Sequence, residues 1–216
     1  MLGALQLAFL DSVNLLLIGV IVAVGIAARH NYAKTTALLI AGDWCGVAGL
    51  ALIMLVIFDG LGPVVQRFVE GPVFGILLIA TGILTAILAL RGGDNQALVQ
   101  KIMRPLHTPG PATVATGVVL GLIQSATSVP FYGGLALLSA AGIDAQVRYA
   151  AIPLYATVAL SLPTLAALAV GWVRAKPHSA AARGFDWARA HPDQVTAAAT
   201  WSVAALLIVL GVTHVM

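Results

Sequence analysis

Long apolar runs, separated by short polar connections, dominate the hydrophobicity pattern of the chain. The runs are continuous rather than alternating, and several approach the roughly 20 residues that a helix needs to cross a bilayer. The pattern predicts an all-α integral membrane protein with six transmembrane helices. The predicted spans cover residues 2–28, 35–58, 72–90, 112–141, 148–173 and 195–215.

Composition favours a membrane protein over a soluble one. Hydrophobic residues make up 60% of the chain and charged residues 9%, whereas a soluble domain carries about 25% charged residues. The net charge of +3 does not indicate nucleic-acid binding, because the basic residues lie in short connections between apolar runs. The single cysteine, Cys45, excludes an internal disulfide.

Lysine and arginine residues are concentrated in the odd-numbered connections, which hold nine of the 11 in the chain. The positive-inside rule then predicts that these connections are cytoplasmic and that both termini lie outside. The expected location is the bacterial cytoplasmic (inner) membrane, with membrane lipids as partners. A homodimer is left open.

The chain divides into two similar halves when residue n is set beside residue n + 113. This alignment places Asp11-Ser12 beside Gln124-Ser125 and Asn14 beside Thr127. Each half holds three spans, so the halves insert in opposite orientations, as a 3+3 inverted-topology repeat. In such transporters the site lies near the midplane between the repeats. At about 1.5 Å per residue, both clusters lie about 15 Å from opposite faces, so we expect them to meet.

The predicted organisation is a first repeat over 1–93, a cytoplasmic linker over 94–111 and a second repeat over 112–216. Within the linker, Leu98, Ile102 and Leu106 recur at helical spacing. They predict a short amphipathic helix on the inner leaflet.

Two carboxylates lie inside predicted spans of the first half. Asp11, with Ser12 and Asn14 beside it, favours a proton or cation path, because a buried charge is expensive unless it has a function. Asp43 is a second candidate for the path. The alternatives are a neutral structural carboxyl at Asp11, interhelical hydrogen bonding by Asn14, and an Asp43 side chain that reaches interfacial water.

The second half offers polar side chains followed by a proline. Pro130 removes a backbone donor and frees the carbonyl near residue 126, which polar groups must then satisfy. Broken helices of this kind often line transporter sites, although an ordinary kink is the alternative. The candidate path residues of this half are Gln124, Ser125, Thr127, Ser128, Pro130 and Tyr132.

No sequence pattern indicates an enzyme, a cofactor or a fixed metal site. The five histidines lie at connections or span ends, without partners at metal-ligand spacing. The chain has no Walker motif, so we do not expect it to hydrolyse ATP.

The stretch Leu10-Asp11-Ser12-Val13-Asn14 is similar to an entry motif of the lysine exporter (LysE) superfamily. The layout most closely resembles the small actinobacterial peptidoglycolipid-addressing (Sap-type) membrane proteins. That resemblance implies six spans, inverted repeats and polar motifs in the first and fourth spans. Leu15 stands where the family has a proline, so the resemblance does not by itself predict a break in the first span.

The sequence therefore favours a secondary transporter, an exporter of a small amphipathic or lipid-linked molecule coupled to protons or cations at Asp11 and Asp43. A divalent metal exporter is one alternative, although Gln124 stands where a further carboxylate is expected. A non-transporting membrane subunit of a larger complex is the other. A thiol-electron carrier is disfavoured, because such carriers need a cysteine in each of spans 1 and 4.

Overall fold

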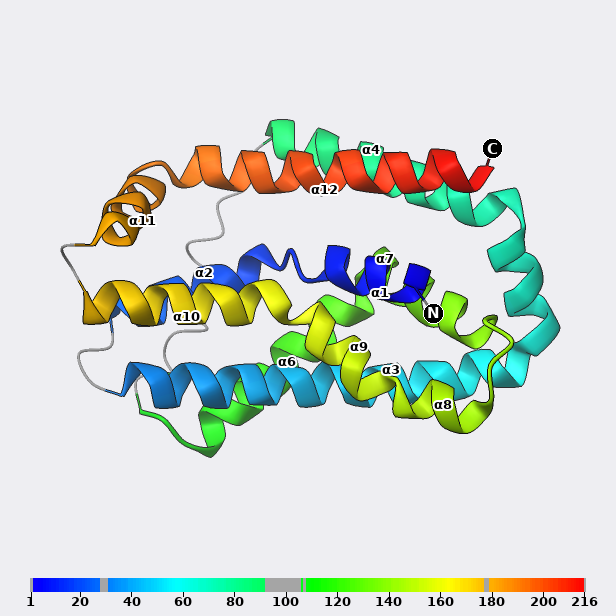
Figure 1. Cartoon of the computed structure of the whole chain (residues 1–216), viewed down its shortest axis with the longest axis horizontal. Coiled ribbons are helices and arrows are strands. Elements are labelled where there is room, and N and C mark those ends of the chain that lie inside the picture. Colours follow the sequence, from blue (N-terminus) through cyan, green and yellow to red (C-terminus); the bar gives the residue numbers. More distant parts are fainter. Residues whose placement is uncertain (1, 28–30, 92–105, 107, 177–178, 216) are drawn as a thin grey trace.

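The computed structural model describes residues 2–27, 31–91, 106, 108–176 and 179–215, and the secondary structure of these residues is helical (Figure 1). The predicted linker helix over 94–106 lies almost wholly outside the described residues. In chain order the helices are α1 (Leu2–Asp11), α2 (Leu15–Ala27), α3 (Tyr32–Glu70), α4 (Pro72–Arg91), α6 (Pro111–Ala126), α7 (Val129–Ser139), α8 (Ala145–Ala150), α9 (Ile152–Ala159), α10 (Ser161–Ala175), α11 (Ala180–Ala190) and α12 (Pro192–Val215).

Two predicted spans correspond to single helices, namely α4 and α12. The second span was predicted too short, because α3 begins at Tyr32 and continues helically to Glu70. Residues 59–71, expected to be a connection, are therefore largely helical. The change of direction occurs inside α3 at Gly62, whose φ of 20° and ψ of −90° are outside the helical region. Glycine tolerates this conformation, and Pro63 restarts the helix.

The remaining three predicted spans are bent at a break. The axes of α1 and α2 differ by 48°, those of α6 and α7 by 76°, and the helix axis changes by 43° between α9 and α10. In the sequence, Pro130 predicts the break in the fourth span, and Pro153 and Pro163 predict only kinks in the fifth. The break in the first span has no proline.

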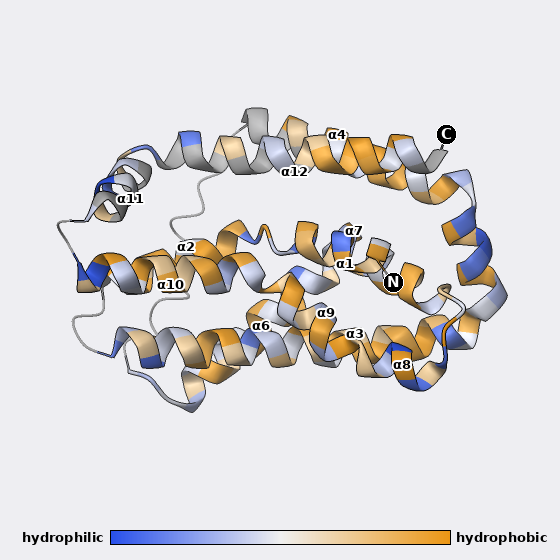
Figure 2. Ribbon diagram, in the orientation of Figure 1, coloured by the Kyte–Doolittle hydropathy of each residue, from blue (hydrophilic) through white to orange (hydrophobic). Residues whose placement is uncertain are grey.

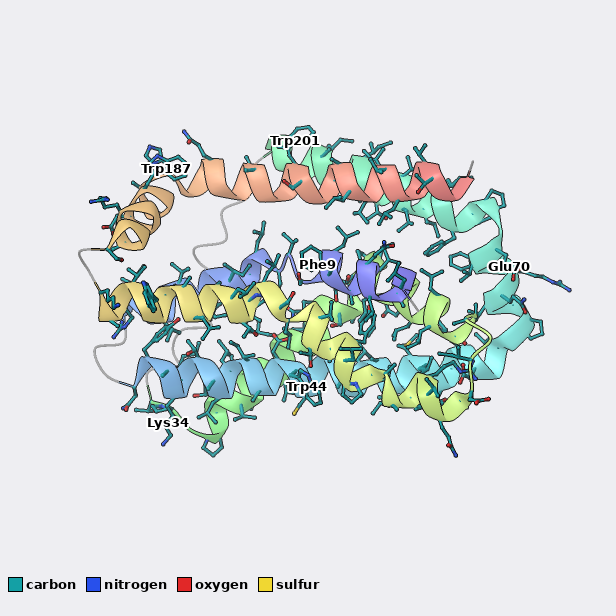
Figure 3. All side chains as sticks on the ribbon, in the orientation of Figure 1. Phe9, Lys34, Trp44, Glu70, Trp187 and Trp201 are labelled. Atoms are coloured by element: carbon teal, nitrogen blue, oxygen red, sulfur yellow. The ribbon has the colours of Figure 1, made fainter. Side chains whose placement is uncertain are left out.

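One described helix, α3, is by itself long and apolar enough to cross a membrane, and the three bent pairs raise that number to four. Figure 2 shows apolar residues along the middle of the molecule and hydrophilic residues gathered toward the two ends of its long axis. In Figure 3, Lys34 and Trp187 lie toward one end and Glu70 at the other, whereas Phe9 and Trp44 lie between. The arrangement is that of a membrane protein whose helices run along this axis.

Glycines bring α3 and α6 into backbone contact. A Cβ on Gly42 would strike the carbonyl of Val114, and one on Gly117 would strike the carbonyl of Leu39. Gly46 and Gly121 repeat the arrangement one turn further on. Small residues four apart on two facing helices permit this close approach, which dispersion forces then stabilise in lipid.

A polar network connects the C-terminal part of α3 to α7 and α8. Arg148 of α8 forms an ion pair with Asp59 of α3, with 3.1 Å between Nη1 and Oδ1. Ser139, at the end of α7, donates to the same carboxylate at 2.7 Å, and its carbonyl accepts from Arg148 at 2.7 Å. The ion pair holds α3, α7 and α8 together next to the bend at Gly62.

Substitution of Gly42 by Ala should lower the free energy of unfolding by about 1–3 kcal/mol, because the added methyl forces the α3 and α6 backbones apart. Gly49→Ala is the matched control on the same helix, since nothing lies within 4 Å of its added Cβ. It should be neutral or slightly stabilising, because alanine favours the helix. Denaturant unfolding in mixed micelles measures both, and equal effects would contradict the packing described.

Candidate functional site

The breaks in the first and fourth predicted spans meet, and polar side chains bridge them in both directions. The Ser128 hydroxyl, in the α6–α7 break, donates to the Asp11 carboxylate at the end of α1. The Asn14 amide, in the α1–α2 break, donates to the side-chain carbonyl of Gln124 near the end of α6. The expectation that the two clusters meet is confirmed.

Asn14 and Ser128 also hold the helices that follow the breaks. Asn14 Oδ1 accepts a hydrogen bond from the backbone N–H of Leu17 at 3.0 Å. Ser128 Oγ accepts one from the backbone N–H of Phe131 at 3.2 Å. Each residue is therefore an N-cap, for α2 and α7 respectively. Asn14 explains why the first span breaks without a proline: its side chain satisfies a backbone donor that the break exposes.

Asp43 joins this cluster from α3. Both of its carboxylate oxygens accept from the Gln124 amide, at 2.8 and 3.1 Å. A continuous chain of hydrogen bonds therefore runs from Asn14 through Gln124 to Asp43. The Asp43 side chain is fully buried, so the alternative that it reaches interfacial water is wrong. Because α3 begins at Tyr32, Asp43 lies roughly 16 Å along the helix axis, deeper than the sequence suggested.

Pro130 and Tyr132 form the first turn of α7. The helix is interrupted before Pro130, at Thr127 and Ser128, and Pro130 lies within the first two positions of the new helix. The freed carbonyl of Ala126 accepts from the Tyr132 hydroxyl at 3.1 Å. The prediction that this carbonyl needs a polar partner is confirmed. The helix is interrupted here and its axis bends by 76°, so the alternative of an ordinary kink is wrong.

Besides Pro130 and Tyr132, three predicted path residues form no hydrogen bond with the cluster. Ser12 is buried and donates to the carbonyl of Phe9 at 2.5 Å. Thr127 bonds to the carbonyls of its own helix, at 3.0 and 3.1 Å, and is exposed. Ser125 is buried, and its hydroxyl has no hydrogen-bond partner within the described part of the chain.

The two carboxylates have only uncharged hydrogen-bond partners. Asp43 is bonded by an amide and Asp11 by a hydroxyl. In the described ranges, neither forms an ion pair with a lysine or arginine, and the ion pair found there is Arg148–Asp59. Asp43 is fully buried and Asp11 is partly buried, and a proton or a bound cation would offset the charge of a carboxylate in apolar surroundings.

Sequence reasoning missed contributions from the fifth span. The break between α9 and α10 falls at Leu160, which packs in one core cluster with Leu17 and Leu120. Ser161, directly after it, has a buried hydroxyl without a partner among the described residues. Trp44, beside Asp43, donates to Thr157 of α9 at 3.2 Å. The only sequence signal of a change in helix direction in this span was the pair Pro153 and Pro163.

Comparison with known proteins gives no relatives: no family, no curated protein and no solved structure matches the chain.

Replacing Gln124 by Leu should lower the free energy of unfolding by about 1–3 kcal/mol, because Asp43 loses its donor and Asn14 its acceptor. Gln66→Leu is the control, since this amide lies on the exposed side of α3 and bonds only to nearby Glu70. In the double variant Asp43→Leu with Gln124→Leu, the loss should be smaller than the sum of the single losses. Additive losses in the unfolding cycle would show that the two side chains are not coupled.

Proposed function

We propose that the chain is a secondary transporter with six spans in two inverted repeats, which exports a small amphipathic or lipid-linked molecule in exchange for protons or cations. The observation that carries the proposal is the crossing of two broken helices, where the partly buried Asp11 and the fully buried Asp43 have only neutral hydrogen-bond partners. Interrupted helices with polar groups at the break are typical of transporter sites.

The reciprocal hydrogen bonds support the inverted repeat. The cap residue of each broken span, Asn14 or Ser128, bonds to the polar residue that precedes the other break, Gln124 or Asp11. A two-fold axis between the repeats would exchange these two bonds. The offset of 113 residues pairs Asp11 with Gln124, and it places the two caps within one position of each other.

Helix packing supports the same relation. α3 packs on α6, and the fifth span, through α9, packs on α1. α2 packs on α10, and α7 packs on α3. The third and sixth predicted spans, α4 and α12, pack on each other side by side (Figure 1). Exchange of the two halves interchanges the α3–α6 and α1–α9 contacts, interchanges the α2–α10 and α3–α7 contacts, and maps the α4–α12 contact onto itself. The α1–α7 contact has no comparably extensive α2–α6 counterpart in the described part of the chain.

The distribution of residues along the long axis supports the proposed orientation. Lys34 and Trp187 belong to the first and fifth connections and lie toward the same end, whereas Glu70 lies at the opposite end (Figure 3). The positive-inside rule assigns the end with Lys34 to the cytoplasm of a bacterial cell. The proposed location is the cytoplasmic membrane.

A divalent metal ion is a weaker candidate for the substrate. Hard divalent cations prefer six or more oxygen ligands. The amide oxygens of the cluster are already acceptors, from Leu17 N–H at Asn14 and from Asn14 at Gln124. This leaves the carboxylates of Asp11 and Asp43, and the described residues hold no group of three or more His, Cys, Asp or Glu side chains.

Asp11→Asn should abolish the component of transport that an ion gradient drives, because an amide cannot take up and release a proton or bind a cation as a carboxylate does. The assay follows a fluorescent single-chain amphiphile across reconstituted vesicles, with a membrane-impermeant quencher outside. A pH gradient is imposed in one arm and a sodium gradient in the other. Asp144→Asn, at an exposed carboxylate, should behave like the wild type. Unchanged gradient dependence in Asp11→Asn would remove this carboxylate from the coupling.

Single-cysteine variants test the orientation. Cys45 is the only cysteine, so Cys45→Ala provides a background without thiols. In intact cells, a membrane-impermeant maleimide should label Glu70→Cys and leave Lys34→Cys unlabelled until the membrane is permeabilised. Both positions are exposed. The reverse pattern would invert the proposed topology.

A further inference from the structure

An apolar cavity of about 380 Å³ lies beside the bend of α3. It is enclosed by the bent part of α3, the start of α4 and the first half of α7. Its volume is within the range of roughly 300–1,000 Å³ found for small-molecule sites. It is also more than twice the size of an engineered cavity of about 150 Å³ that binds benzene.

The cavity walls suit a hydrocarbon and offer nothing to a polar ligand. The side chains that line it are aliphatic or aromatic, including Phe58, Phe68 and Phe74. The one hydroxyl among the lining residues belongs to Tyr132, and it is engaged by the carbonyl of Ala126. An occupant would therefore be held by its apolar area alone.

The cavity and the polar cluster share the first turn of α7. Val129 and Tyr132 line the cavity, and Ser128, which bonds Asp11, directly precedes Val129. The polar pair of Ser128 and Asp11 is therefore one residue along the chain from the cavity wall. This contiguity of a polar and an apolar site is what an amphiphile requires.

Backbone features of α3 and α7 shape the cavity. The bend at Gly62 lies between Phe58 and Val64, both of which line the cavity. A Cβ on Gly133 would come within 3.0 Å of the Phe74 ring, so the glycine lets this ring lie against α7. Val64 and Leu77 are 65% and 42% exposed and line the cavity, so its mouth opens on the apolar surface.

We propose that this cavity binds the hydrocarbon chain of the transported amphiphile while the polar group of the same molecule lies at Ser128 and Asp11. The inference rests on the proposed function and specifies it: the substrate class is a single-chain amphiphile with a small polar head. The chain-binding cavity lies on the Glu70 side of the cluster, which is the outer half in the proposed orientation.

Leu77→Trp tests the cavity, because an indole at the exposed mouth fills it without disturbing the buried core. Leu84→Trp is the matched control: it lies on the same helix, is 56% exposed and does not line the cavity. The probe is a long-chain alkyl amphiphile with a diazirine on the chain, added to the full chain in vesicles of phosphatidylglycerol and phosphatidylcholine. Mass spectrometry maps the cross-linked peptides.

In the wild type and in Leu84→Trp, we expect the probe to label the peptides that contain Val64–Phe68 and Val129–Ala136. In Leu77→Trp, labelling of these peptides should fall by about tenfold, which corresponds to excluding about two methylene groups of the chain. Equal labelling of the two tryptophan variants would overturn the proposal.

A phospholipid that carries the same diazirine on one acyl chain identifies the source of the chain. The proposal expects it to label the lipid-facing helices without preference for the cavity peptides. Labelling of the cavity as strong as that by the amphiphile would assign the cavity to bulk lipid and overturn the proposal.

The transport function and the chain-binding cavity can be tested separately. Asp43→Asn, which lies outside the proposed binding site, should remove gradient-driven flux and leave cavity labelling in place. If the cavity of the wild type is labelled but no gradient-driven flux is measured, the transport proposal is wrong and the binding site is supported. If gradient-driven flux depends on Asp11 but the cavity is not labelled, only the binding-site proposal is wrong.

Discussion

The structure depends on one constraint: a helix that breaks inside an apolar environment must find partners for the backbone groups that it frees. The first and fourth predicted spans meet this constraint with side chains from their own breaks. Asn14 and Ser128 cap α2 and α7, and Tyr132 bonds the carbonyl of Ala126. The two cap residues can also donate hydrogen bonds: Asn14 donates to Gln124, and Ser128 donates to Asp11. The same residues therefore make the breaks tolerable and join them into one cluster.

Close packing determines where the second carboxylate lies. Asp43 is between Gly42 and Gly46 on the face of α3 that contacts the α6 backbone. A larger residue at either glycine would separate the helices and draw Gln124 away from the carboxylate. The tight interface thus explains how a fully buried Asp43 obtains two hydrogen bonds from a single amide. Among the described residues, the partner of that carboxylate is the Gln124 amide and not a lysine or arginine, and the proposed coupling is based on this pairing.

The two halves have the same plan but different chemistry. The first half supplies both carboxylates of the cluster, and the second supplies the amide and hydroxyl that bond them. The second half also supplies, through α7, the wall shared by the cluster and the apolar cavity. In the proposed transport mechanism, Asp11 and Asp43 would bind the proton or cation, and α7 would position the substrate.

By itself the sequence determined that the protein is helical and suited to a membrane, because apolar run length and the scarcity of charge are local properties. It also identified Asp11, Asn14, Asp43, Gln124 and Ser128 as unusual, because polar side chains in apolar runs stand out in one dimension. Only the tertiary structure decided that these five are hydrogen-bonded to one another in two groups, Asp11 with Ser128 and Asn14 with Gln124 and Asp43. It also decided that Ser12 and Thr127 bond to their own helices. The break at Asn14, the length of α3 and the ion pair of Asp59 with Arg148 also escaped sequence reasoning. Each depends on which partner lies across the interface, and hydrophobic periodicity contains no information about the partner.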